Sequence, residues 1–195
     1  MVKKRMRILF LLFVSAACVG AAALHGASPV ILENEKDMDH ILISDAQVPL
    51  ANAPGTSVDW ENTLTEAQLT EVQEVLQLVN EARADAGVSP LALDPMLCKA
   101  AQVRATECIT TFSHTRPDGT AYSTALSEQG VSASYIGENV ATGYQNAQAV
   151  VSGWINSEGH RANILNGNYK HIGIGMAENA GTIYRGYSWS QLFTD

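Results

Sequence analysis

The apolar residues of this chain change their spacing once, near residue 170, and this change constrains the possible folds most. Between residues 63 and 157 they recur at intervals of three and four, which is the spacing of one helix face. Residues 171–177 and 182–193 instead alternate, as strands with one buried face do. Gly173 and Gly175 predict a close approach of the first strand to its neighbours. The order predicts an α+β domain with helices first and paired strands last.

Residues that cap helices set the expected helix boundaries. Thr63 and Glu66 have the spacing of a capping box and predict the start of the first helix. Asp94, followed by a proline, predicts the N-cap of the second helix. The expected helices cover residues 63–87, 94–112, 123–129 and 146–157.

The N-terminal residues have the pattern of a targeting segment. Four basic residues within positions 3–7 precede a nearly continuous apolar stretch over residues 8–24, which ends in small residues. This pattern predicts a secretory signal peptide over residues 1–23, cut after Ala23. A membrane anchor is the competing interpretation, because the stretch is only slightly shorter than the roughly 20 residues of a spanning helix. Cys18 leaves lipidation as a third interpretation. All three place the protein outside the cytoplasm, secreted or at the cell surface.

Residues 24–62 are predicted to be a flexible acidic tether before a domain over residues 63–195. The segment has few aromatic residues, three prolines and an acidic stretch over residues 33–39. Its one apolar patch, residues 40–43, could dock as a strand.

The charge balance excludes some classes of partner. Removal of the signal peptide would take away four basic residues and no acidic ones, so the formal net charge would change from −8 to −12. Such an acidic protein is a poor binder of polyanions, which argues against nucleic acid and anionic lipid as partners. No second apolar run has spanning length, so we expect no transmembrane segment after signal removal.

Two cysteines remain beyond the predicted signal peptide, Cys98 and Cys108. On one helix, ten residues at about 1.5 Å each separate them by roughly 15 Å. A disulfide requires Cα atoms about 4.4–6.8 Å apart. We therefore expect two buried free thiols rather than a bridge.

Two histidines and two glutamates lie in three short segments, residues 112–114, 137–139 and 154–165. They are His114, Glu138, Glu158 and His160. Imidazole and carboxylate groups bind divalent metals and move protons near neutral pH. Each residue alone has a structural explanation: His114 could cap a helix end, for example, and Glu138 could accept backbone amides of a tight loop. Taken together, they indicate a cleft.

In this order, the three segments resemble the CAP superfamily of cysteine-rich secretory proteins, venom allergens and plant pathogenesis-related proteins. The resemblance is strongest to the bacterial secreted SCP-like branch and covers about residues 63–195. It implies a three-layer α-β-α sandwich. It also implies that His114, Glu138 and His160 line one cleft, and that the histidines bind a divalent metal such as zinc. The second glutamate of the family falls on Ser157 here, and Glu158 lies one residue further along.

These residues support two hypotheses of function and leave enzymatic activity open. The first is an extracellular binding or scaffold module that recognises a peptide, glycan or lipid. The second is a metal-assisted hydrolase of peptide or cell-wall substrates, with His114, Glu138, His160 and Glu158 as the candidate catalytic cluster. The serine at 157 removes a proton-handling group and favours binding. The chain lacks both the HExxH motif of zinc peptidases and a GxSxG nucleophile elbow.

Overall fold

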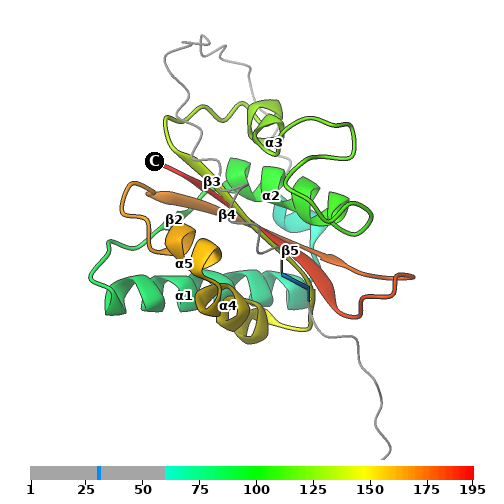
Figure 1. Ribbon diagram of the computed structural model, residues 1–195, viewed down its shortest axis with the longest axis horizontal. Helices are drawn as coiled ribbons and strands as arrows, with labels where there is room; N and C mark the ends of the chain where they lie inside the picture. The colour runs from blue at the N-terminus through cyan, green and yellow to red at the C-terminus, as the bar shows by residue number, and fades with distance from the viewer. Residues whose placement is uncertain (1–29, 32–59) are drawn as a thin grey trace, which may run out of the picture.

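The protein, seen in a computed structural model that describes residues 30–31 and 60–195, has one sheet between two layers of helices (Figure 1). Helices α2 (Pro95–Glu107) and α3 (Ser123–Glu128) cover one face of the sheet. Helices α1 (Glu66–Asp85), α4 (Ala147–Asn156) and α5 (Glu158–Ile164) cover the other. The predicted α+β fold with three α-β-α layers is confirmed.

In the part of the chain that the structure describes, the sheet has five strands in the order β1-β3-β5-β4-β2. Strand β5 lies at its centre and pairs antiparallel with β3 and β4 along its whole length. The short strand β2 runs parallel to β4, and β1 runs antiparallel to β3. The strands are β1 (Val30–Ile31), β2 (Ala92–Leu93), β3 (Ile136–Tyr144), β4 (His171–Glu178) and β5 (Tyr187–Thr194).

The capping box that begins α1 lies two residues later than predicted. The N-cap is Thr65, whose hydroxyl accepts from the backbone N–H of Gln68, while the Gln68 side chain accepts from the backbone N–H of Thr65. Thr63 instead ends a short 3-10 helix, η1 (Trp60–Thr63), and its hydroxyl donates to the Trp60 carbonyl at 2.6 Å. A threonine that bonds the carbonyl behind it is not available to cap the helix ahead of it, so the predicted pair of Thr63 and Glu66 was wrong.

Helix α2 begins as predicted and ends earlier. The Asp94 carboxylate accepts from the backbone N–H groups of Met96 and Leu97 at 2.8 and 2.9 Å. The helix stops at Glu107, so Phe112 lies in the loop that follows. The stop coincides with three β-branched residues, Ile109–Thr111, which have low helix propensity.

Strand β3, helix α5 and the short elements β1, β2 and η1 were not predicted from the sequence pattern. Glu138, for which a tight loop was one alternative, lies in the buried first part of β3. Helix α4 is capped by Asn146 and ends where predicted, and α5 follows it directly.

Both cysteines are free and buried, as expected. Burial raises the pKa of the Cys98 thiol and of the Cys108 thiol to about 12. Neither thiol is a nucleophile at neutral pH.

The described chain continues without a gap from Trp60, three residues before the predicted domain boundary, and this side chain is 6% exposed in the main core. Strand β1 (Val30–Ile31) lies within the segment that was predicted to be a tether. The predicted signal peptide and the apolar patch at 40–43 lie outside the described residues. Within residues 30–31 and 60–195, no helix combines the length and apolarity needed to cross a bilayer.

Candidate functional site

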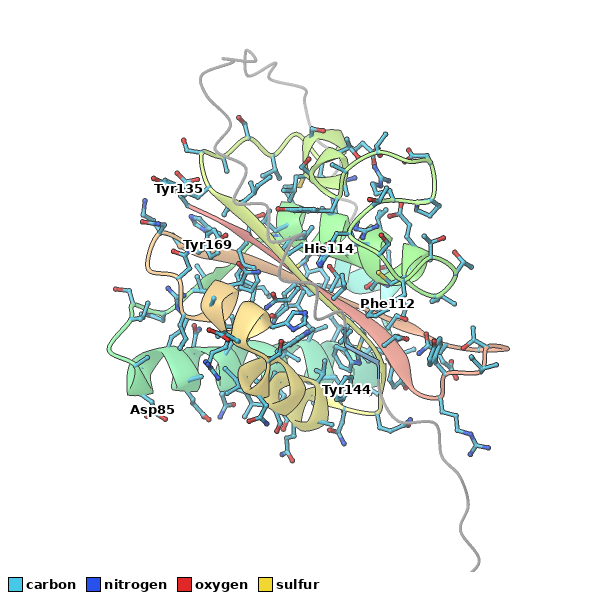
Figure 2. The ribbon with its side chains drawn as sticks, viewed as in Figure 1. Asp85, Phe112, His114, Tyr135, Tyr144 and Tyr169 are labelled. Carbon is cyan, nitrogen blue, oxygen red and sulfur yellow. The ribbon has the colours of Figure 1, made fainter. Side chains whose placement is uncertain are left out.

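Three of the four predicted site residues lie where the loop after α2 and the start of α5 meet strand β3. The loop carries His114, the strand carries Glu138 and the helix carries His160. In Figure 2, His114 lies on the side of the sheet that α2 and α3 cover. The cluster thus joins groups from both helix layers at one strand.

Glu138 orients His114. One carboxylate oxygen, Oε2, lies 2.6 Å from His114 Nδ1. The other, Oε1, accepts from Arg104 Nε at 2.7 Å. The Glu138 side chain is fully buried, whereas that of His114 is 25% exposed. Both oxygens of Glu138 are thus hydrogen-bonded, one to Arg104 and one to His114 Nδ1. The second bond fixes the orientation of the imidazole ring and leaves its Nε2 atom available to other partners.

Arg104 is the centre of a buried ionic network. Its guanidinium also donates to Glu107 Oε2 at 2.5 Å and to the Ser113 carbonyl, next to His114, at 2.6 Å. Burial lowers the pKa of Arg104, but the Glu138 carboxylate outweighs this and holds the pKa above its ordinary value. The same arginine therefore fixes both the carboxylate that orients His114 and the backbone that leads into it.

The network continues from Glu107 toward the surface. Arg116 donates to Glu107 Oε1 at 2.8 Å and to Glu128 Oε1 at 2.6 Å. Burial raises the pKa of Glu107, but the hydrogen bonds from Arg116 and Arg104 outweigh this and lower it below its usual range. Sequence reasoning missed Glu107, although its position three residues after Arg104 on a helix was a usable signal.

His160 is held by a serine. Its Nδ1 lies 2.8 Å from Ser157 Oγ, and its backbone carbonyl accepts from Asn139 Nδ2 at 3.1 Å. The residue is 5% exposed. Burial lowers the pKa of His160 to about 4, and repulsion by His114 adds to this. At neutral pH, His160 is thus an uncharged imidazole with its Nε2 atom away from Ser157.

Two asparagines attach α5 to β3. Asn163 Nδ2 donates to the Glu138 carbonyl at 3.2 Å and to Asn139 Oδ1 at 3.0 Å. Asn139 Nδ2 also donates to Gln191 Oε1 at 3.0 Å. These buried bonds fix the position of His160 relative to Glu138.

Glu158 is not part of this cluster. Its side chain is exposed in the first turn of α5, where a carboxylate interacts favourably with the helix dipole. Over residues 60–195, it makes no hydrogen bond or ion pair. Ser157, at the position of the family's second glutamate, is the residue that contacts His160.

The cluster histidines offer two imidazole nitrogens as donors to a metal. Each histidine has its Nδ1 bound within the protein, which leaves two Nε2 atoms. In the part of the chain that the structure describes, no group of three or more His, Cys, Asp or Glu side chains is arranged around one point. Catalytic zinc sites have three protein ligands, so a metal here would take two imidazoles and complete its coordination with water or ligand atoms.

We expect the metal-free protein to lose about 2–3 kcal/mol of unfolding free energy between pH 7 and pH 4.5 through His160. The pKa of His160 is about 4 in the folded protein, while an unfolded histidine has a pKa of about 6.5. Between these values the unfolded chain binds the additional proton, so stability is complete above about pH 6.5 and falls toward pH 4. Urea unfolding in the presence of a chelator measures this loss. It should be largely absent in His160→Gln and retained in His171→Gln, which changes a half-buried histidine in β4. Equal pH profiles of His160→Gln and wild type would contradict the assignment.

Comparison with known proteins shows which family the sequence matches. The model of the CAP family, the cysteine-rich secretory protein family, matches residues 76–193. The Bacillus subtilis protein YkwD is 33% identical over 147 residues, which are 73% of this chain and 55% of that protein. A second Bacillus subtilis protein, the membrane protein YlbC, is 33% identical over 111 residues, or 56% of this chain and 32% of the relative. The match thus spans about half of YkwD and a third of YlbC.

Solved structures share the fold. An extracellular protein of Bacillus anthracis that contains an SCP domain matches with a TM-score of 0.58 and 27% identity, over 67% of this chain and 44% of that one. A cysteine-rich secretory protein of Staphylococcus aureus matches with a TM-score of 0.55 and 20% identity, over 67% and 40%. An outer surface protein of Borrelia burgdorferi matches with a TM-score of 0.55 and 22% identity, over 64% and 91%.

Proposed function

Because this chain belongs to the bacterial branch of the CAP family, the cysteine-rich secretory proteins, we propose that it is an extracytoplasmic binding module with a metal-binding cleft. The N-terminal pattern supports export, and the Bacillus anthracis neighbour is an extracellular protein. The strongly negative charge supports a peptide, glycan or neutral lipid as the ligand rather than nucleic acid.

The hydrogen bond of 2.6 Å between Glu138 and His114 carries the proposal for a divalent metal. A carboxylate that binds one imidazole nitrogen fixes the ring and raises the basicity of the other nitrogen, as carboxylate–histidine pairs do in zinc sites. His160 adds a second imidazole that is uncharged at neutral pH, which is the protonation state of a metal ligand. His114 and His160 would hold the metal, and Glu138 and Ser157 would position them. When bound, the metal supplies a Lewis acid with free coordination positions.

A metal-assisted hydrolase of peptide or cell-wall substrates is the second candidate. The free coordination positions favour it, because a catalytic metal needs room for water. Both oxygens of Glu138, however, are already hydrogen-bonded within the protein, and Ser157 stands in place of a second carboxylate. The available proton acceptors are therefore fewer than in a four-residue cluster, and this favours binding over hydrolysis.

Zinc titrated calorimetrically into the full chain should bind at one site. The His114→Ala/His160→Ala variant should weaken this binding at least about tenfold, because both imidazole ligands are lost. The matched control is His171→Ala, which removes a histidine outside the cluster and should bind as wild type does. Equal heats from all three proteins would refute the metal site. If zinc binds, release of soluble fragments from purified cell wall with and without chelator distinguishes the hydrolase from the binding module.

A further inference from the structure

Arg83 is a fully buried arginine outside the ionic network of Arg104. It lies in the last turn of α1, and in the part of the chain that the structure describes it forms no ion pair. Its guanidinium donates instead to four backbone carbonyls at 2.6–3.2 Å, those of Ser89, Ile164, Asn166 and Tyr169. Burial lowers the pKa of Arg83, but an arginine remains charged at neutral pH. Fully buried arginines are rare without a carboxylate partner, because their desolvation is costly.

Three of the four carbonyls belong to the end of α5 and to the loop that follows it, the α5–β4 loop (residues 165–170). Ile164 is the last residue of α5, so its carbonyl has no partner within the helix. The positive charge of Arg83 also lies at the negative end of the helix dipole. With seven residues, α5 is too short to be stable as an isolated helix. Its position therefore depends on contacts such as these.

The α5–β4 loop is bound to β3 through Tyr169. The ring stacks on Phe193 with centroids 5.3 Å apart, and the hydroxyl donates to the Ile136 carbonyl at 3.0 Å. Burial raises the pKa of Tyr169 to about 12, so the hydroxyl keeps its proton at neutral pH. A Cβ atom at Gly137 would lie 2.5 Å from the hydroxyl oxygen. The loop thus contacts β3 directly before Glu138.

We propose that Arg83 is a positioning residue that sets the distance between His160 and Glu138. It binds the end of α5, four residues after His160, and also the backbone of Tyr169, which contacts β3 beside Glu138. The two cluster histidines lie on different elements, so their Nε2 atoms can reach one metal only if α5 and β3 keep a fixed separation. The functional consequence rests on the proposed metal site, whereas the positioning itself can be measured without metal.

Arg83→Lys keeps the positive charge but replaces the planar guanidinium with a single ammonium group, which cannot bind four separate carbonyls. Zinc titrated calorimetrically into the full chain should bind this variant about tenfold more weakly than wild type. The matched control is Val72→Ala, which truncates a fully buried side chain of the same helix about 16 Å from Arg83 along its axis. This control also lowers stability, but it should bind zinc as wild type does.

Tyr169→Phe provides a second test if Arg83→Lys does not fold. It removes the hydroxyl bond between the α5–β4 loop and β3 and changes no charge. We expect it to weaken zinc binding about threefold.

NMR spectroscopy of the metal-free protein, with chelator present, measures the positioning directly. The buried side-chain amides of Asn139 and Asn163 donate to the carbonyls of His160 and Glu138, so their signals report the contact between α5 and β3. These signals should move in Arg83→Lys and in Tyr169→Phe, and they should stay in place in Val72→Ala.

Wild-type zinc affinity in a folded Arg83→Lys protein would overturn the proposal. An equal loss of affinity in Arg83→Lys and Val72→Ala would also overturn it, because lowered stability would then be the cause. If Arg83→Lys does not fold, wild-type affinity and unmoved amide signals in Tyr169→Phe have the same meaning. If wild type binds no zinc, the proposed metal site fails and the amide signals decide alone. Signals that move in Arg83→Lys but not in Val72→Ala support the positioning role, and unmoved signals overturn it.

Discussion

Arg104→Met is expected to lower the free energy of unfolding by about 3–5 kcal/mol. Arg104 is fully buried and contacts two carboxylates and the Ser113 carbonyl. Methionine is similar in length but donates no hydrogen bond, so it would leave the buried Glu138 carboxylate without its cation. Urea denaturation at pH 7 measures the loss.

Two further variants separate the unpaired charge from lost packing. Arg161→Met makes the same change at an exposed arginine, whose one side-chain hydrogen bond among the described residues is to the Ile155 carbonyl, and it should change stability by no more than about 0.5 kcal/mol. Adding Glu138→Gln to Arg104→Met removes the unpaired charge, so the double variant should be more stable than Arg104→Met alone. If the double variant is the less stable of the two, the stabilising effect of Arg104 does not come from its pair with Glu138.

The ionic network explains why the site residues differ in role. Charges alternate in sign from Glu128 through Arg116, Glu107 and Arg104 to Glu138, with His114 at the end. Each of the three carboxylates in this ionic network is paired with at least one arginine. Such an arrangement fixes the orientation of His114 before any ligand arrives. Preorganised imidazoles suit metal binding, and because the network already binds both oxygens of Glu138, this carboxylate acts by orienting His114.

Elements with local signals could be predicted from the sequence. Asp94 caps the helix that it was expected to cap, and Asn146 caps the helix that was expected to begin there, because both side chains bond backbone groups only two or three residues away. The alternating pattern likewise identified β4 and β5, although β5 begins at Tyr187, later than the expected start at residue 182. In each case the stabilising contact is close in sequence, or the burial pattern is regular.

Strand β3 could not be predicted in this way, because almost every residue in it is buried and its two faces show no alternation. The contacts of Glu138 are equally non-local, since Arg104 is 34 residues away and His114 is 24 residues away. The family resemblance identified His114, Glu138 and His160, but only the fold shows that Arg104 connects the first two. It also shows that Glu158 is exposed while the adjacent Ser157 bonds His160.

Gly173→Ala is expected to destabilise the protein by about 3 kcal/mol or more. A Cβ atom at Gly173 would lie 2.1 Å from the Leu97 carbonyl carbon and 2.2 Å from its oxygen. Gly175 faces Ala101 at 2.3 Å in the same way, so α2 packs with its backbone directly on β4. A clash with helix backbone cannot be relieved by a change of rotamer, and the helix must move away from the sheet. Since α2 also carries Arg104, this movement would strain the ionic network, and thermal unfolding should show the loss.

Gly167→Ala is the matched control. Its added Cβ would have no atom within 4 Å, so the change should alter stability by no more than about 1 kcal/mol. A Gly173→Ala protein as stable as this control would show that α2 can shift on β4 at little cost. The buried ion pairs of Arg104 would then tolerate displacement as well, and a fixed orientation of His114 could not be attributed to them. A large loss confined to Gly173→Ala would instead support a helix held rigidly on the sheet, with the orientation of His114 set by that packing.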